Sequence, residues 1–298
     1  MTLFHGLSAF PPTPTDDAGT LDADAMRGLL LRLAEAEVDS IGLLGSTGGY
    51  AFLRREQRRR AVEVAVECVR GRTPIMVGVG ALRTDDAQSL ARDAKAAGAD
   101  GLLLAPVSYT PLTDAEVYLH FTAVSEAGRL PLCIYNNPST TKFTFCDDLI
   151  ARLAQVPNIV AIKMPIPTNG DCASELARLR ARTPQGFSIG YSSDWGAGNA
   201  LLAGCDCWYS VVAGLMPKPA LMLTKAARAG DSDAVARIDS QFRPLWDEFE
   251  EFGSFRVMYA IADLLGLAKA EPPRPVLPIP QDARGRVDRA LEQLCVVQ

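Results

Sequence analysis

The sequence predicts a (β/α)₈ TIM barrel with a C-terminal helical extension, an α/β fold in which eight parallel strands alternate with helices. Short apolar runs, rich in Val, Ile and Leu, alternate with longer amphipathic segments, as is typical of parallel strands buried on both faces. The length of 298 residues is one that such barrels reach as a single unit. No Gly-x-Gly-x-x-Gly turn follows the first run, which disfavours an open doubly wound sheet.

Eight apolar runs are the predicted strands. They cover residues 6–10, 40–44, 75–78, 101–105, 132–136, 159–163, 188–191 and 207–212. The predicted helices of the barrel cover residues 21–37, 54–70, 84–97, 113–127, 147–154, 173–182, 196–203 and 218–229. Cap residues such as Asp22 at the starts and glycines such as Gly71 and Gly128 at the ends mark helix boundaries.

The chain continues beyond the eighth unit. Residues 231–251, 255–265 and 281–295 have helical patterns, and residues 271–280 are rich in proline. We therefore expect a barrel over residues 1–230 and a helical extension over residues 231–298 that packs on it.

Composition excludes several classes of protein. The net charge is −5 and no Lys/Arg stripe with interleaved aromatic residues occurs, so nucleic acid is not an expected partner. No uninterrupted apolar stretch is long enough for a membrane span and no signal peptide is recognisable, so we expect a cytoplasmic location. Seven scattered cysteines predict reduced thiols. With only two histidines, no metal site and no cofactor is expected.

Reactive groups of such barrels lie at the carboxyl ends of the strands, where two residues draw attention. Lys163 ends the sixth apolar run, and an amine at the mouth of an apolar barrel is partly desolvated and available as a nucleophile. Tyr135 ends the neighbouring run, where a phenol can pass protons to and from a reacting group. A solvated lysine and a structural tyrosine with a satisfied hydroxyl would occupy the same positions.

Two further strand ends carry polar residues. Ser46 and Thr47 lie in a glycine-rich turn after the second strand, where two hydroxyls and exposed N–H groups suit a carboxylate, although a plain turn would have the same composition. Tyr109 follows the fourth strand and either extends a proton relay or simply packs.

Together these motifs resemble the dihydrodipicolinate synthase / N-acetylneuraminate lyase family, from Gly6 to about Pro280. The resemblance implies that Lys163 forms a Schiff base with a 2-oxo acid such as pyruvate and that Tyr135 is the general acid/base. It implies that Ser46 and Thr47 hold the carboxylate and connect to Tyr135, with Gly48 in the same motif. It also implies a homotetramer, a dimer of dimers in which Tyr109 lies near a neighbouring subunit's site. The segments that carry the resemblance are Gly45-Ser46-Thr47-Gly48, Tyr135-Asn136-Asn137-Pro138 and Ile162-Lys163.

The chain also departs from the pattern of the synthases. Thr140 stands where the synthases usually have an arginine that clamps a substrate carboxylate, and Gly49 stands where they usually have glutamate. Besides Thr140, the residues expected to line the variable part of the pocket are Tyr191, Ser192, Ser193, Asp194 and Tyr209.

The predicted function is therefore that of a Schiff-base lyase or aldolase acting on a 2-oxo acid and an aldehyde. An aldolase or dehydratase of 2-keto-3-deoxy sugar acids could use the same residues. Two further classes are compatible with a barrel of this kind: one that binds a small carboxylate without turnover, and a metal-dependent aldolase.

Overall fold

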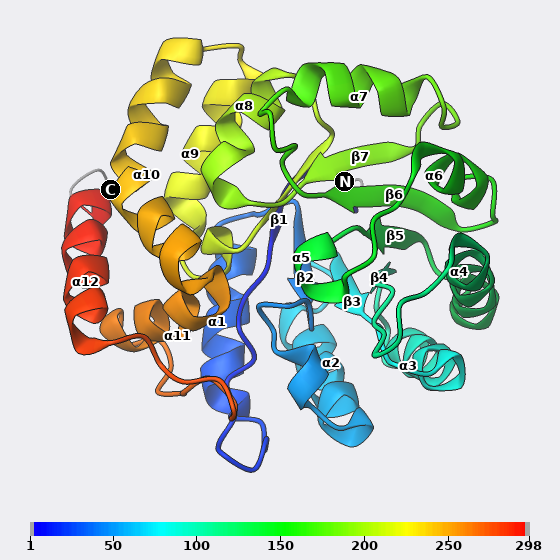
Figure 1. The fold of residues 1–298 in the computed structure, drawn as a ribbon. Coiled ribbons are helices and arrows are strands. Elements are labelled where there is room, and N and C mark those ends of the chain that lie inside the picture. Colours follow the sequence, from blue (N-terminus) through cyan, green and yellow to red (C-terminus); the bar gives the residue numbers. More distant parts are fainter. Residues whose placement is uncertain (1–2, 296–298) are drawn as a thin grey trace.

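The computed structural model describes residues 3–295, and within them eight parallel strands close into a barrel in sequence order (Figure 1). Strand β1 pairs with both β2 and β8, which closes the barrel. The predicted fold class is confirmed, although several strands end one or two residues earlier than predicted. The strands are β1 Gly6–Ala9, β2 Ser40–Leu43, β3 Ile75–Gly78, β4 Gly101–Leu104, β5 Leu132–Tyr135, β6 Ile159–Met164, β7 Ser188–Tyr191 and β8 Cys207–Ser210.

Helices follow the strands and surround the barrel. The side chain of Asp22 accepts a hydrogen bond from the backbone N–H of Ala25, so it caps the first helix as predicted. The longer helices around the barrel are α1 Ala23–Glu35, α2 Arg55–Val69, α3 Thr84–Ala96, α4 Asp114–Gly128, α6 Asp147–Leu153, α7 Cys172–Arg180, α8 Ala197–Leu202 and α9 Pro217–Arg228.

Four short helical turns lie in the loops after strands. Helix α5, Pro138–Thr141, was not predicted; it begins with a proline at a position where the fixed backbone angle suits a helix start. Three 3₁₀ turns, η1 Tyr50–Phe52, η2 Asp194–Gly196 and η3 Val212–Gly214, follow β2, β7 and β8. These turns build the rim of the barrel at the carboxyl ends of the strands.

The apolar side chains form two separate cores. Inside the barrel, Phe10, Met76, Leu103, Cys133 and Tyr209 belong to one buried cluster. The outward-facing side chains of the strands form a larger cluster with the surrounding helices. Burial on both faces explains why the strands read as apolar runs without alternation.

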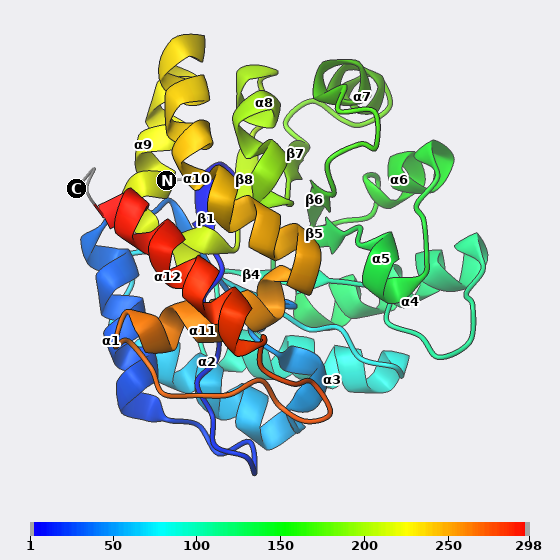
Figure 2. The ribbon, with the colours of Figure 1, turned by 60° about the vertical axis from the view of Figure 1, so that its left-hand side comes forward.

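The C-terminal part consists of α10 Ser232–Phe252, α11 Ser254–Leu264 and α12 Gln281–Cys295. Figures 1 and 2 show these helices, coloured from yellow through orange to red, together on one side of the barrel, and α10 packs on α9. Leu245, Trp246 and Phe249 of α10 belong to the same apolar cluster as the outer faces of the strands. The boundary at residue 230 stays a prediction, because a shared core does not itself divide the chain.

Within residues 3–295, no helix combines the length and the apolar character that a membrane span requires. The cytoplasmic location remains a prediction.

Candidate active site

Lys163 lies on β6, next to Tyr135 of β5 in the register of the two parallel strands. Its side chain is 3% exposed, and its Nζ lies 3.9 Å from the centroid of the Phe10 ring and 4.4 Å from that of Tyr135. No carboxylate of residues 3–295 forms a salt bridge with it. The rings of Phe10 and Tyr135 therefore pack against the amine inside the barrel.

Phe10 reaches this position because glycines make room for it. A Cβ atom on Gly42 would lie 2.3 Å from Cζ of Phe10, and one on Gly45 would lie 2.8 Å from its Cδ1. The ring therefore sits directly against the backbone of β2 and of the turn that follows. On its edge it meets Tyr209, whose ring centroid is 6.2 Å away. The amine of Lys163 thus lies among the aromatic rings of Phe10, Tyr135 and Tyr209 inside the barrel.

Tyr135 is tied to two polar side chains through its hydroxyl. Asn137 donates a hydrogen bond to it from Nδ2 at 2.9 Å, and Ser46 Oγ lies 3.3 Å from the same oxygen. The predicted connection between the glycine-rich turn and the tyrosine is therefore present, and it runs through Ser46. Thr47 is buried and lines the same cavity. A phenol with a hydrogen-bond donor and a hydroxyl partner is equipped to give up and take back a proton.

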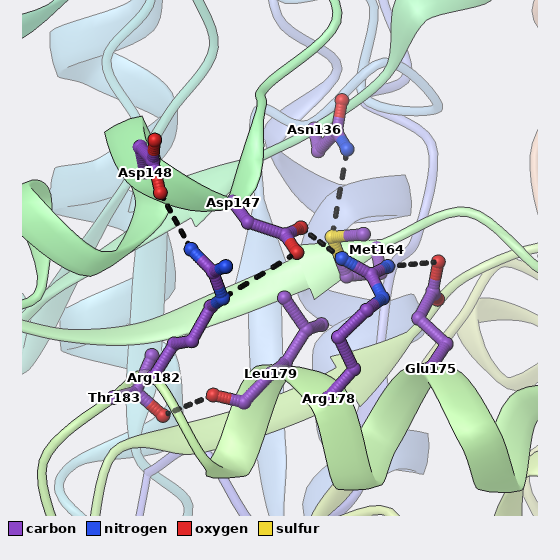
Figure 3. A network of polar contacts seen from close by, with 9 residues as sticks. All are labelled: Asn136, Asp147, Asp148, Met164, Glu175, Arg178, Leu179, Arg182 and Thr183. Atoms are coloured by element: carbon purple, nitrogen blue, oxygen red, sulfur yellow. Dashed lines mark hydrogen bonds and ion pairs between the residues drawn. The ribbon is translucent and has the colours of Figure 1, made fainter.

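The strands that carry Tyr135 and Lys163 are also connected behind the site. Asn136 donates from Nδ2 to the sulfur of Met164 at 3.5 Å, as Figure 3 shows. In the same view, Arg178 of α7 pairs with Asp147 of α6. The first contact joins the ends of β5 and β6, and the second joins the helices that precede and follow β6.

A cavity of about 510 Å³ opens above Lys163 and Tyr135. The loops after β2, β5, β6, β7 and β8 form most of its wall, and Ser46, Thr47, Thr140, Ser192 and Ser193 line it as expected. Asp194 also lines it, but its carboxylate is occupied: it accepts hydrogen bonds from the indole of Trp208 and from the backbone of Val211 and Val212. Burial raises the pKa of Asp194, and these donors act in the opposite direction.

One wall of the cavity was not predicted. Phe249, Gly253, Ser254 and Phe255, at the corner between α10 and α11, line it from the C-terminal part of the chain. The glycine at residue 253, between two helical patterns, was a signal for a sharp corner, and its φ is +79°. Nothing in the local pattern indicated that this corner faces Lys163, because that placement depends on how α10 packs.

Two predicted pocket residues lie elsewhere. Tyr191 points outward from β7 into the cluster between barrel and helices, where burial and the neighbouring Glu175 raise its pKa. Tyr209 is fully buried inside the barrel, with its ring centroid 5.7 Å from Nζ of Lys163. Neither residue is among those that line the cavity, and their contact with substrate stays a prediction.

Tyr109 and Gly48 also lie outside the cavity lining. Tyr109 is 97% exposed in the loop after β4, so it makes no relay within its own chain. Gly48 is buried, and a Cβ atom there would lie 2.9 Å from Cα of Leu44, so the turn needs a glycine to pack. The roles of both residues at a substrate stay predictions.

A larger cavity, of about 930 Å³, lies between α11, the loop near Asp16 and the proline-rich segment, and none of the predicted site residues lines it.

The fold and the site define a class of protein: a (β/α)₈ barrel with a buried lysine and a hydrogen-bonded tyrosine side by side at the carboxyl ends of adjacent strands. The chain belongs to the dihydrodipicolinate synthetase family, whose profile matches residues 3–294. It is 33% identical over 286 residues to a 4-hydroxy-tetrahydrodipicolinate synthase of Methylococcus capsulatus, covering 96% of this chain and 97% of that protein.

Solved structures give the same result. A dihydrodipicolinate synthase from Agrobacterium tumefaciens is 60% identical, with a TM-score of 0.97 and a coverage of 98% of both chains. A structure described as a putative dihydrodipicolinate synthetase from Pseudomonas aeruginosa is 28% identical, with a TM-score of 0.90, and covers 97% of this chain and 99% of that one.

Proposed function

We propose that this protein is a lyase of the class I aldolase type, which forms a Schiff base between Lys163 and pyruvate or a related 2-oxo acid. The observation that carries the proposal is the buried amine of Lys163, which forms no salt bridge within residues 3–295 and lies 4.4 Å from the centroid of the Tyr135 ring. The relatives named 4-hydroxy-tetrahydrodipicolinate synthase support an activity of the lyase class.

In the proposed reaction, the neutral amine of Lys163 attacks the keto carbon of the 2-oxo acid. Tyr135 donates its proton to the oxygen of the carbinolamine, which leaves as water, and then takes a proton from the neighbouring carbon to give the enamine. The hydroxyls of Ser46 and Thr47 hold the carboxylate of the 2-oxo acid. The enamine then adds to an aldehyde, and water releases the product and restores the amine; cleavage is the reverse.

Thr140 lines the cavity at the position where the synthases usually have arginine, so the second substrate need not be that of the named relatives. Aldol cleavage or dehydration of a 2-keto-3-deoxy sugar acid uses the same Schiff base. A barrel that binds a carboxylate without turnover would have no need of the Lys163–Tyr135 pair. For a metal-dependent aldolase, residues 3–295 offer no cluster of three His, Cys, Asp or Glu side chains suited to a metal ion.

We also propose a homotetramer in which Tyr109 lies near the site of a neighbouring subunit. Its side chain is 97% exposed in the single chain, as a residue that contacts a second subunit would be. Light scattering measures the mass of the assembly. A monomer at working concentrations would contradict this part of the proposal without affecting the chemistry of Lys163.

Borohydride reduction in the presence of pyruvate tests the central step. We expect a covalent mass adduct on Lys163, and no adduct in Lys163→Ala. Lys142→Ala is the matched control, because Lys142 is an exposed lysine whose ammonium group binds the backbone oxygen of Ser139. Absence of an adduct across several 2-oxo acids would overturn the proposal, and pyruvate binding that survives Lys163→Ala without turnover would favour the non-catalytic barrel.

A further inference from the structure

The cavity above Lys163 is poor in charge. Among residues 3–295, Lys163 is the one cation that lines it, and its amine is used when the Schiff base forms. Asp194 is the one carboxylate of that lining, and its oxygens accept hydrogen bonds from Trp208 and from two backbone N–H groups. A second carboxylate on a substrate would therefore find no charged partner within the cavity of this chain.

The nearby Lys142 does not supply a cation that could pair with a second carboxylate unless its side chain moves. Lys142 follows α5, and its Nζ donates a hydrogen bond to the backbone oxygen of Ser139 at 2.7 Å. Lys142 does not line the cavity. A carboxylate would have to break this contact and pull the side chain inward to use its charge.

Hydroxyl groups are abundant instead. Ser139 and Thr140 of α5, Ser192 and Ser193 after β7, and Ser254 at the start of α11 line the cavity from three directions. Ser139 donates its proton to Asn137 Oδ1 and Ser192 donates its proton to the backbone oxygen of Met164, so both hydroxyls can still accept. Such groups match the hydroxyls of a neutral ligand, which both donate and accept hydrogen bonds.

Aromatic and aliphatic side chains also line the cavity. Phe249, Phe255 and Trp195 line the cavity together with Ile166 and Val211. Phe255 is held in place by stacking on Phe52 at a centroid distance of 5.9 Å and by an edge contact with Tyr259 at 5.3 Å. Rings fixed in this way provide a surface against which the carbon–hydrogen face of a ligand can pack.

We propose that the aldehyde that adds to, or leaves from, the Lys163 enamine is a neutral, hydroxylated aldehyde without a carboxylate of its own. The inference rests on the proposed Schiff-base function and names its second substrate. The enamine carbon forms a bond to the aldehyde carbon, and the aldehyde oxygen takes its proton from Tyr135. The hydroxyls of the aldehyde face the serine and threonine side chains, and its carbon chain packs on Phe249 and Phe255.

The test measures kcat/KM for three aldehydes at a fixed pyruvate concentration, with pyruvate consumption as the readout. Glyceraldehyde is neutral and hydroxylated, propionaldehyde is neutral without hydroxyls, and succinic semialdehyde carries a carboxylate. We expect kcat/KM for glyceraldehyde to exceed that for each of the other two by about tenfold or more. Propionaldehyde lacks the hydroxyls that would bind the serine and threonine side chains, and the carboxylate of succinic semialdehyde would find no charged partner. Equal or better use of succinic semialdehyde, equal use of propionaldehyde, or no use of glyceraldehyde would overturn the inference.

A variant sharpens the test. Thr140→Arg places a cation at an exposed position of the cavity wall and is expected to raise kcat/KM for succinic semialdehyde by about tenfold. The matched control is Thr140→Gln, which lengthens the side chain without a charge. Because it also removes the hydroxyl, it is expected to lower kcat/KM for glyceraldehyde, but not to raise kcat/KM for succinic semialdehyde. A gain with Gln as large as with Arg would contradict the charge argument. Trapping of pyruvate on Lys163, measured in each variant, separates failure of this inference from failure of the Schiff-base proposal.

Discussion

Ser46 and Tyr135 lie 89 residues apart in the sequence, and their side-chain oxygens lie 3.3 Å apart at the mouth of the barrel. The contact joins the turn after β2 to the end of β5. A phenol connected in this way, with Lys163 on the next strand, can exchange protons with groups bound to that lysine.

Tyr135→Phe removes the hydroxyl but keeps the ring beside Lys163. We expect kcat to fall by about 10²–10⁴, the usual contribution of a positioned general acid/base. Borohydride should still trap pyruvate on Lys163 after long incubation, because the nucleophile is intact. A steady-state assay and mass spectrometry measure the two effects. Turnover within about twofold of the wild type would show that Tyr135 is structural.

Asn137→Ala removes the N–H donor that lies 2.9 Å from the phenolic oxygen. We expect kcat to fall by about tenfold, the effect of one lost hydrogen bond, with KM for the 2-oxo acid nearly unchanged. Lys142→Ala is the control, because Lys142 lies in the same loop, does not line the cavity and makes no contact with the Asn137–Tyr135 pair. A loss of kcat in the control as large as in Asn137→Ala would contradict the assigned role.

The roles expected of Lys163 and Tyr135 came from the family resemblance. The local pattern of the chain was sufficient to place the two residues at neighbouring strand ends, because strand ends converge in a parallel barrel. It was not sufficient for Tyr191. A strand buried on both faces has no alternation, so the sequence did not reveal that Gly190 faces the barrel interior while Tyr191 faces the helices. Phe249 and Phe255 were missed for a related reason, since an apolar side chain on an amphipathic helix looks the same whether it fills a core or lines a cavity.

Gly42→Ala tests the packing of the Phe10 ring between Gly42 and Lys163. The new methyl group would lie 2.3 Å from Cζ of Phe10, so the ring that packs against Lys163 must move. We expect the free energy of unfolding to fall by about 1–3 kcal/mol, the usual cost of overpacking a core, together with a loss of activity. Urea denaturation measures the first effect.

Gly28→Ala is the matched control for this change. Gly28 is an exposed residue of α1, and a Cβ atom there would meet nothing within 4 Å. Replacement of a helical glycine by alanine is expected to raise the free energy of unfolding by about 0.5–1 kcal/mol. If both variants were equally stable, steric contact with Phe10 would not be the reason for the glycine at residue 42.

His120 of α4 makes the stability of the protein depend on pH. The ring is 9% exposed, its Nδ1 lies 3.0 Å from Thr84 Oγ1, and burial lowers its pKa below the ordinary value of 6.5. The folded state therefore keeps the ring neutral at a pH where the unfolded chain already binds a proton. This contribution to stability is fully present above pH 6.5 and is lost as the pH falls from 6.5 through the lower pKa of the folded state.

Urea denaturation at pH 7.5 and at pH 5 checks this sign in His120→Gln. Between the two pH values, the variant should lose less of its free energy of unfolding than the wild type, because glutamine has no proton to bind. His5→Gln serves as the control, since His5 is exposed and its replacement removes no buried group; it should keep the wild-type difference. A wild-type loss on acidification no larger than that of His120→Gln would show that His120 is not the group responsible.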